Sequence, residues 1–141
     1  MDRVLADTGV WYEMFDPRRL DADEIREIRK KAEILDFCRL VVPWPTLYET
    51  LRSRMVNNRI AMQLMENYLK RPNLEYVDDA PYREEALKQA FSWCSRGRPL
   101  GMVDCLIRLV LDDIKIKIDV LATVDPKDFV DVCRKKRIEI I

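Results

Sequence analysis

The stretch RVLAD, at residues 3–7, has the composition of a short buried β-strand that ends in an acidic residue. Later stretches of the chain have similar apolar character and similar length. These further strands are expected at LVV (40–42), LEYV (74–77), KIDVLAT (117–123) and RIEII (137–141). The chain is therefore expected to contain about five short strands, distributed from end to end.

The segments between these strands carry apolar residues at steps of three and four, the period of a helix that is buried on one side. Helices are expected at 21–38, from Pro45 to Met55, and at 57–70, 81–96, about 102–111 and 126–135. Strands that alternate with helices predict a parallel sheet covered on both faces. The expected fold class is α/β, a three-layer α/β/α arrangement around a central, mainly parallel sheet of about five strands. A chain of 141 residues fits one domain, 1–141.

Composition excludes several classes of protein. No apolar run approaches the roughly 20 residues that a membrane span needs, and the start, MDRVLADTGVW, lacks the layout of a signal peptide. We therefore expect a cytoplasmic protein without membrane contact. Basic and acidic residues number 25 each, a balance that neither requires nor excludes nucleic acid, because binding depends on local patches.

Histidine is absent, which excludes Ser-His-Asp and Cys-His nucleophilic chemistry and any histidine-bound metal. The cysteines lack the spacing of a zinc site, and we expect all of them to be buried free thiols within helices. They are Cys38, Cys94, Cys105 and Cys133. Catalysis, if present, relies on carboxylates or other remaining polar groups, or on a metal bound by oxygen.

Acidic residues follow the expected strands. Ligands of an open parallel sheet bind beyond the carboxyl ends of its strands. Asp7 follows the first strand, Glu49 lies shortly after the second, and Thr123 and Asp125 follow the fourth. Asp104 interrupts the start of the most apolar helix. These side chains are therefore expected to gather at one edge.

Gathered carboxylates repel one another. At an effective dielectric of about 20, two charges about 4 Å apart interact by roughly 4 kcal/mol, and burial adds to the cost of ionisation. A divalent cation relieves both effects. Ligands that are oxygen only favour hard ions, so Mg²⁺ or Mn²⁺ is the expected cofactor.

The segments VLADTGVW, PTLYETL, PLGMVDCLI and LATVDPKDF resemble, in this order, the acidic segments of the PIN domain, especially of VapC-type toxin ribonucleases. The resemblance covers nearly the whole chain, except that 50–97 shows nothing to match. It implies a metal-dependent endoribonuclease, the toxin of a toxin–antitoxin pair, that cuts RNA, dimerises and is inhibited by an antitoxin protein. Gly9 departs from the family pattern, which often has serine or asparagine there, so a polar contact near the metal is missing.

In this interpretation the metal ligands and catalytic groups are Asp7, Glu49, Asp104 and Asp125. One or two Mg²⁺ ions polarise the scissile phosphate and lower the pKa of the attacking water. Thr8 and Thr123 orient a water or a ligand carboxylate, and Asp128 competes with Asp125 for the last position. Residues proposed by sequence proximity to guide the RNA backbone are Arg52, Arg54, Arg98 and Lys127.

Each of these residues also has a local interpretation. Asp7 and Asp125 are candidate helix caps, Glu49 can pair with Arg52, and Asp104 with Arg108, three and four residues apart. The tryptophans are expected to pack in the core or at an interface rather than to stack on bases; they are Trp11, Trp44 and Trp93.

Two further functions remain open. The first is a non-catalytic PIN-like module that binds RNA or a protein. The second is phosphoryl transfer on a small molecule, which the absence of a glycine-rich phosphate loop disfavours in a chain with three glycines. Apolar residues on or near the segment 57–70 are candidates for a dimer face, or equally for the core: Met55, Met62, Met65 and Leu69.

Overall fold

Five parallel strands form the centre of the protein in a computed structural model, which describes all residues, 1–141. The strands are β1 (Arg3–Ala6), β2 (Arg39–Pro43), β3 (Leu74–Val77), β4 (Val120–Ala122) and β5 (Glu139–Ile140). Their order across the sheet is β3-β2-β1-β4-β5, and every neighbouring pair is parallel. The five strands expected from the sequence are all present.

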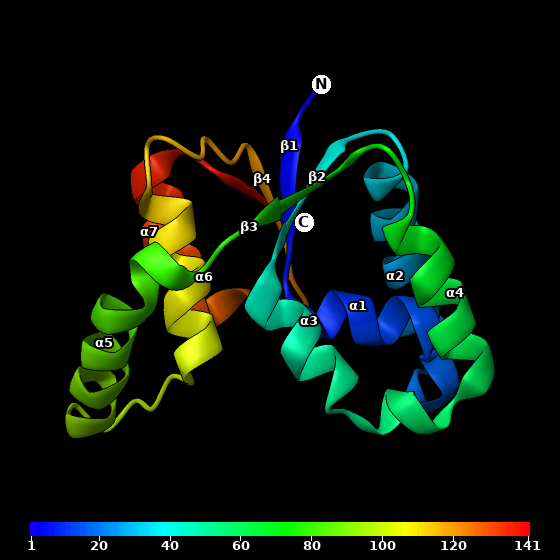
Figure 1. Ribbon diagram of the computed structural model, residues 1–141, viewed down its shortest axis with the longest axis horizontal. Helices are drawn as coiled ribbons and strands as arrows, with labels where there is room; N and C mark the ends of the chain where they lie inside the picture. Colours follow the sequence, from blue (N-terminus) through cyan, green and yellow to red (C-terminus); the bar gives the residue numbers. More distant parts are fainter.

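Seven α-helices cover the sheet. They are α1 (Thr8–Phe15), α2 (Ala22–Leu35), α3 (Trp44–Leu51), α4 (Arg59–Leu69), α5 (Arg83–Ser95), α6 (Met102–Asp112) and α7 (Val130–Lys136). In Figure 1, α5, α6 and α7 lie on one side of the strands, and α2 and α4 lie on the other. The three-layer α/β/α fold is therefore confirmed.

Alternate residues of β1 enter the two apolar layers, as the period of a strand requires. Val4 and Ala6 join a large cluster on the side of α1, α2, α3 and α4, with Trp11 at its centre. Leu5 faces the opposite layer, where α6 and α7 contribute Ile107 and Val132. Both faces of the central strand are thus buried, which explains why RVLA contains no alternating polar residues.

Helix α1 is the one element that helical periodicity fails to predict. Its sequence, TGVWYEMF, is almost entirely apolar, so it has no polar stripe opposite the buried side. Its buried residues are Val10, Trp11 and Phe15, and Trp11 stacks on Phe15 at 6.0 Å between ring centroids. A helix this short and this apolar resembles a buried strand in sequence, and only the packing shows that it is helical.

Two expected helices are shorter in the structure. The helix expected from Pro45 to Met55 ends at Leu51, and Ser53 then begins a 3-10 turn, where its hydroxyl accepts a hydrogen bond from Met55 N at 3.2 Å. The helix expected at 126–135 begins only at Val130, because residues Pro126–Asp128 form a 3-10 turn. Both differences place a polar turn beside a helix end.

Of two alternatives for the apolar residues near 57–70, the core holds for Met55 and Met65, which are only 0% and 1% exposed; Met62 and Leu69 pack against that core at its edge. The expectation that all cysteines are buried in helices is wrong in part. Cys94 is exposed, because α5 is an outer helix whose one buried residue is Ala86, and Cys38 lies in the turn before β2 rather than in a helix. The other two thiols are buried as expected. No helix is both long enough and apolar enough to cross a membrane.

The burial of Met55 and Met65 gives a stability test. Replacing either by alanine removes side-chain atoms from the core and is expected to lower the free energy of unfolding by about 2–5 kcal/mol, measured by urea denaturation. The matched control is Leu64→Ala on α4, the helix of Met65. Leu64 is exposed, so its loss is expected to change stability by less than about 0.5 kcal/mol. Equal effects of the core and control substitutions would contradict the assignment.

Candidate functional site

The candidate site lies at the carboxyl edge of the sheet, where the direction of strand addition reverses. From β1 the sheet grows through β2 and β3 on one side and through β4 and β5 on the other. Such a reversal is where open α/β sheets bind ligands. Asp7 directly follows β1 and Thr123 directly follows β4, and α1 and α3 begin at the same end of the sheet (Figure 1).

Asp7 is held by hydrogen bonds to both of its carboxylate oxygens. Oδ1 accepts from the backbone N–H of Thr8 at 2.7 Å, and Oδ2 accepts from the hydroxyl of Thr123 at 3.1 Å. Only 8% of Asp7 is exposed. Burial raises the pKa of Asp7, the two hydrogen bonds oppose that shift, and the charges of Glu49 and Asp125 add to it. Asp7 therefore caps α1 and is also part of a group of carboxylates.

Glu49 joins this group through Thr8. The Thr8 hydroxyl donates to Glu49 Oε1 at 2.6 Å, a bond that links the first turn of α1 to α3. The carboxylate of Glu49 is thus held by Thr8 and not by Arg52, its candidate local partner. Thr8 serves Asp7 through its backbone and Glu49 through its side chain, so that one residue orients two carboxylates.

Among these carboxylates, Asp104 has the pKa that is shifted furthest from its ordinary value. It lies in the first turn of α6, half-buried. Burial is the largest cause that raises its pKa to about 7, followed by the negative charges of Asp7, Asp128, Glu49 and Asp125. Five carboxylates from α3, α6 and the ends of β1 and β4 therefore share one region and repel one another there.

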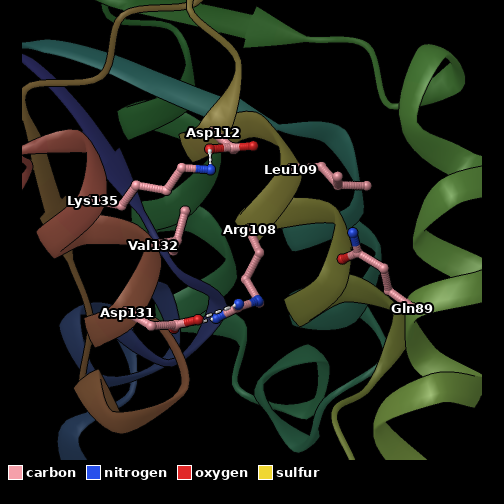
Figure 2. A pocket seen from close by; sticks show the side chains of 7 residues that line it. All are labelled: Gln89, Arg108, Leu109, Asp112, Asp131, Val132 and Lys135. Carbon is pink, nitrogen blue, oxygen red and sulfur yellow. Dashed lines mark hydrogen bonds and ion pairs between the residues drawn. The ribbon is translucent and has the colours of Figure 1, made fainter.

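Arg108 does not neutralise Asp104, although it lies one turn further along α6. Its guanidinium donates to both oxygens of Asp131 at 2.7 Å and to the carbonyl of Asp128 at 2.8 Å. Figure 2 shows the two hydrogen bonds from Arg108 to Asp131 at the wall of a cavity of about 290 Å³. The cavity is lined by α6 and α7, together with Gln89 of α5. Lys135 pairs with Asp112 in the same view, at 3.4 Å. In this cavity positive and negative side chains pair, whereas Asp7, Glu49 and Asp104 have no such partner.

Asp125 and Asp128 both adjoin the cluster. The backbone N–H of Asp125 donates to the Thr123 hydroxyl at 3.1 Å, while its carboxylate makes no capping bond to the following turn. Asp128 is half-buried and acts more strongly than Asp125 on the pKa of Asp104, whereas Asp125, and not Asp128, acts on that of Asp7. Asp128 therefore bears more on Asp104, and Asp125 on Asp7.

The basic residues proposed for RNA divide into two groups. Arg98 donates to the carbonyl of Lys127 at 2.9 Å, and Lys127 Nζ lies 4.0 Å from Asp125, so both border the cluster. Arg52 ends α3 and is exposed. Arg54 lines a separate cavity of about 250 Å³ with Asp16, beyond the far end of α1.

Gly9 has a steric role that the sequence gives no signal for. A Cβ atom at this position would lie 2.4 Å from Cγ2 of Val124, closer than real Cβ contacts allow. Val124 follows Thr123, so the glycine lets α1 approach the end of β4 closely. The hydrogen bond between Asp7 and Thr123 spans the same junction. Serine or asparagine at position 9 would displace Val124.

The carboxylates fit a hard cation that keeps part of its water. As the side chains stand, no three of them converge closely enough to hold one metal ion directly. Mg²⁺ commonly retains several waters and binds proteins through one or two carboxylates plus substrate oxygens. Asp7 and Asp104 are the best placed, because Asp7 is buried, Asp104 is half-buried, and Asp7 is the charge that most raises the pKa of Asp104. Neither has a cationic partner among the ion pairs.

Comparison with known proteins shows similarity at the level of the fold. No protein-family model matches the chain, and no curated protein matches its sequence. Among solved structures the chain is similar to the crystal structure of VapBC2 from Rickettsia felis bound to a DNA fragment from their promoter. The TM-score is 0.58, the sequence identity is 12%, and the match covers 99% of this chain and 97% of that chain. Nearly every element thus has a counterpart in a solved fold.

The raised pKa of Asp104 predicts a pH-dependent penalty in the metal-free protein. Between its ordinary value of 3.8 and about 7, the unfolded chain has lost a proton that the folded chain retains, so stability falls as the pH rises through this range. Asp104→Asn removes the penalty. It is expected to raise the free energy of unfolding by roughly 1–2 kcal/mol at pH 8, since solvent screens this partly exposed carboxylate, with little change at pH 4, in urea denaturation with EDTA.

Glu66→Gln on α4 is the matched control for that test, since Glu66 lies in an exposed pair with Lys70. It is expected to leave the difference in stability between pH 4 and pH 8 unchanged. A loss of stability for Asp104→Asn at pH 8 would contradict the assignment of Asp104 as an uncompensated carboxylate.

The contact between Gly9 and Val124 predicts a paired effect. Gly9→Ser overpacks the junction and is expected to lower the free energy of unfolding by about 1–3 kcal/mol. Val124→Ala in the same chain makes room for the new side chain and is expected to restore most of the loss. Urea denaturation of the single and double variants measures both. A Gly9→Ser variant as stable as the unmodified protein would show that Val124 moves aside without cost.

Proposed function

We propose that this chain is a Mg²⁺- or Mn²⁺-dependent endoribonuclease, which hydrolyses RNA phosphodiester bonds as the toxin of a toxin–antitoxin pair. The observation that carries the proposal is the carboxylate cluster at the switch point of the sheet. Asp7, Glu49 and Asp104 adjoin there without a cationic partner, and the pKa of Asp104 is raised to about 7, in part by its neighbours. Such mutual repulsion favours a site that a divalent cation completes.

Each residue then has a role that its contacts support. Asp7 and Asp104 hold the ion, with Glu49 and Asp125 as further ligands, directly or through water. Thr123 and Thr8 fix the orientation of Asp7 and Glu49 by the hydrogen bonds described above. Bound Mg²⁺ supplies Lewis-acid polarisation of the phosphate and an acidified water. Lys127 and Arg98, at the border of the cluster, contact the flanking phosphates.

The toxin assignment has separate support. The solved structure that covers 99% of this chain is a VapBC2 complex on promoter DNA, and the segments around Asp7, Glu49, Asp104 and Asp125 resemble those of VapC-type toxins. We propose that this chain likewise assembles with an antitoxin protein, which covers the carboxylate cluster, and that it forms a homodimer.

The competing function is a PIN-like module that binds RNA or a protein without cutting it. It is supported by the spacing of the carboxylates, no three of which converge on a single ion, and by Gly9, which offers no polar side chain. This function predicts RNA binding that persists in EDTA without products. The cleavage experiment below separates the two.

Cleavage of a panel of labelled RNAs is expected to require Mg²⁺ or Mn²⁺ and to stop in EDTA. Asp7→Asn and Asp104→Asn are expected to abolish it, because each removes a charge that holds the ion. Thr123→Val only frees Asp7 to rotate, so the expected loss is roughly 10- to 100-fold. The matched control, Glu66→Gln, is expected to cleave at the unmodified rate. The readout is the rate of product formation on a denaturing gel.

Full activity of Asp104→Asn would overturn the proposed site. Metal binding is measured independently by titration calorimetry, in which Mn²⁺ is expected to bind the unmodified chain and to bind Asp104→Asn at least tenfold more weakly. Metal binding without cleavage of any RNA in the panel would favour the non-catalytic module.

A further inference from the structure

Three exposed aromatic rings form a column on the surface beside the candidate site. The ring of Trp44 lies between those of Tyr48 and Tyr76, with centroids 6.5 Å and 5.0 Å away and interplanar angles of 27° and 22°. Their exposed fractions are 41% for Trp44, 56% for Tyr48 and 41% for Tyr76. The rings therefore stack on one another outside the hydrophobic core.

The column stands at the same end of the sheet as the carboxylates. Trp44 directly follows β2, and Tyr76 lies near the end of β3, the neighbouring edge strand, paired in register with Val42. The Tyr76 hydroxyl donates to the carbonyl of Leu69 at 3.3 Å, which fixes the base of the column. Tyr48 is the last ring, and only Trp44 stacks on it. One face of Tyr48 is thus left without an aromatic neighbour.

Helix α3 connects the column to the candidate site. Trp44, Tyr48 and Arg52 follow one another at steps of four residues and so share one side of the helix. Glu49, the next residue after Tyr48, receives the hydrogen bond from Thr8. Arg52 is exposed and takes part in none of the ion pairs. Two rings and an unpaired guanidinium thus lie in a row along the helix that also carries Glu49.

From this arrangement we infer that the column binds single-stranded RNA, with an unpaired base stacked on the open face of Tyr48. The inference rests on the proposed function for its substrate class and adds which form of RNA the site accepts. Exposed aromatic rings with nearby cations are how proteins hold single strands, because every base has a face to stack. Bases inside a duplex are already stacked on both faces, so the column discriminates against double-stranded RNA.

The geometry supports a nucleotide over a protein partner at this surface. The rings are close to parallel, so a planar base extends the same column, while Arg52 lies one helical turn beyond Tyr48, within reach of the adjoining phosphate. Glu49 is the next residue on the same helix, so a base on Tyr48 lies on the element that carries a carboxylate of the cluster. The column then positions the strand and the carboxylates act on it.

Binding of a single-stranded RNA that carries 2-aminopurine tests the inference. The Asp104→Asn chain in Mg²⁺ serves as the background, so that the RNA stays intact, which a gel verifies. Fluorescence anisotropy gives the affinity, and quenching of 2-aminopurine reports stacking. Tyr48→Ala and Trp44→Ala are expected to weaken binding roughly tenfold each and to remove the quenching. Tyr48→Phe keeps the ring and is expected to retain both.

The matched control is Phe37→Ala, which removes an exposed ring in the turn before β2, at the opposite end of the sheet. It is expected to bind and quench as the background protein does. A duplex of the same sequence is expected to bind more weakly and to lose nothing on Tyr48→Ala.

Three results would overturn the inference. The first is unchanged affinity and quenching in Tyr48→Ala. The second is a loss of affinity for the duplex in that variant that equals the loss for the single strand. The third is a change in mass from dimer to monomer in sedimentation, with the RNA affinity unchanged. The last result would identify the column as an interface between two copies. Failure of the nuclease proposal looks different: the unmodified chain would cut no RNA, while the stacking-dependent binding would persist.

Discussion

The parallel pairing of β1 with both of its neighbours determines where every functional group of the protein lies. The backbone N–H of Asp7 donates to the carbonyl of Ala122 at 2.9 Å, so that the last bond of the β1–β4 ladder is made by the residue that carries the first carboxylate. One position further, Thr123 N–H donates to Ile141 at 3.1 Å and its hydroxyl reaches Asp7. Since all strands are parallel, their carboxyl ends meet at one edge. Asp7 thus owes its place to the sheet, whereas Glu49 and Asp104 are carried by α3 and α6.

Helix α6 shows how Asp104 remains without a counter-charge. Asp104, Arg108 and Asp112 recur every four residues, a spacing that permits ion pairs within the helix. Arg108 instead forms a bidentate pair with Asp131, and Asp112 pairs with Lys135 and Lys136, all of them on α7. These pairs hold α6 against α7 and leave Asp104 alone at the other end of the helix. One part of α6 is thus held by ion pairs, while its first turn carries an unpaired carboxylate. This arrangement is consistent with a site that is destabilising until it binds a cation.

Much of the fold follows from sequence, because each of β1 to β5 is a short apolar run and most helices show a clear period. Helix α1 does not, since residues such as Trp11 and Phe15 make it apolar on most sides. The sequence marks Asp7 and Asp125 by their positions after strands, and Asp104 by its place in an apolar helix. That these carboxylates bind one metal ion stays a prediction. The contact between Gly9 and Val124, the pairing of Arg108 with a residue 23 positions away, and the column of Trp44, Tyr48 and Tyr76 were not predictable. Each joins segments that are distant in sequence, and no local pattern records such a contact.

Rigidity of α3 explains why one short helix can serve both a carboxylate and an aromatic column. The helix begins at Trp44 with no loop after β2, and Pro45 in its first turn restricts the backbone there. Two buried threonines bond back to the main chain: Thr46 Oγ1 donates to the carbonyl of Pro43 at 2.7 Å, and Thr50 Oγ1 donates to that of Thr46 at 2.6 Å. These bonds satisfy the buried hydroxyls within the helix itself. The packing of Leu47 in the core and the hydrogen bond from Thr8 to Glu49 fix the rotation of the helix about its axis. With that rotation fixed, Glu49 is directed at Thr8 and the adjacent Tyr48 at solvent, so the separation of the Tyr48 ring from the Glu49 carboxylate is set by the helix itself. A loop in this position would leave that distance variable, whereas groups that act together on one substrate need fixed separations.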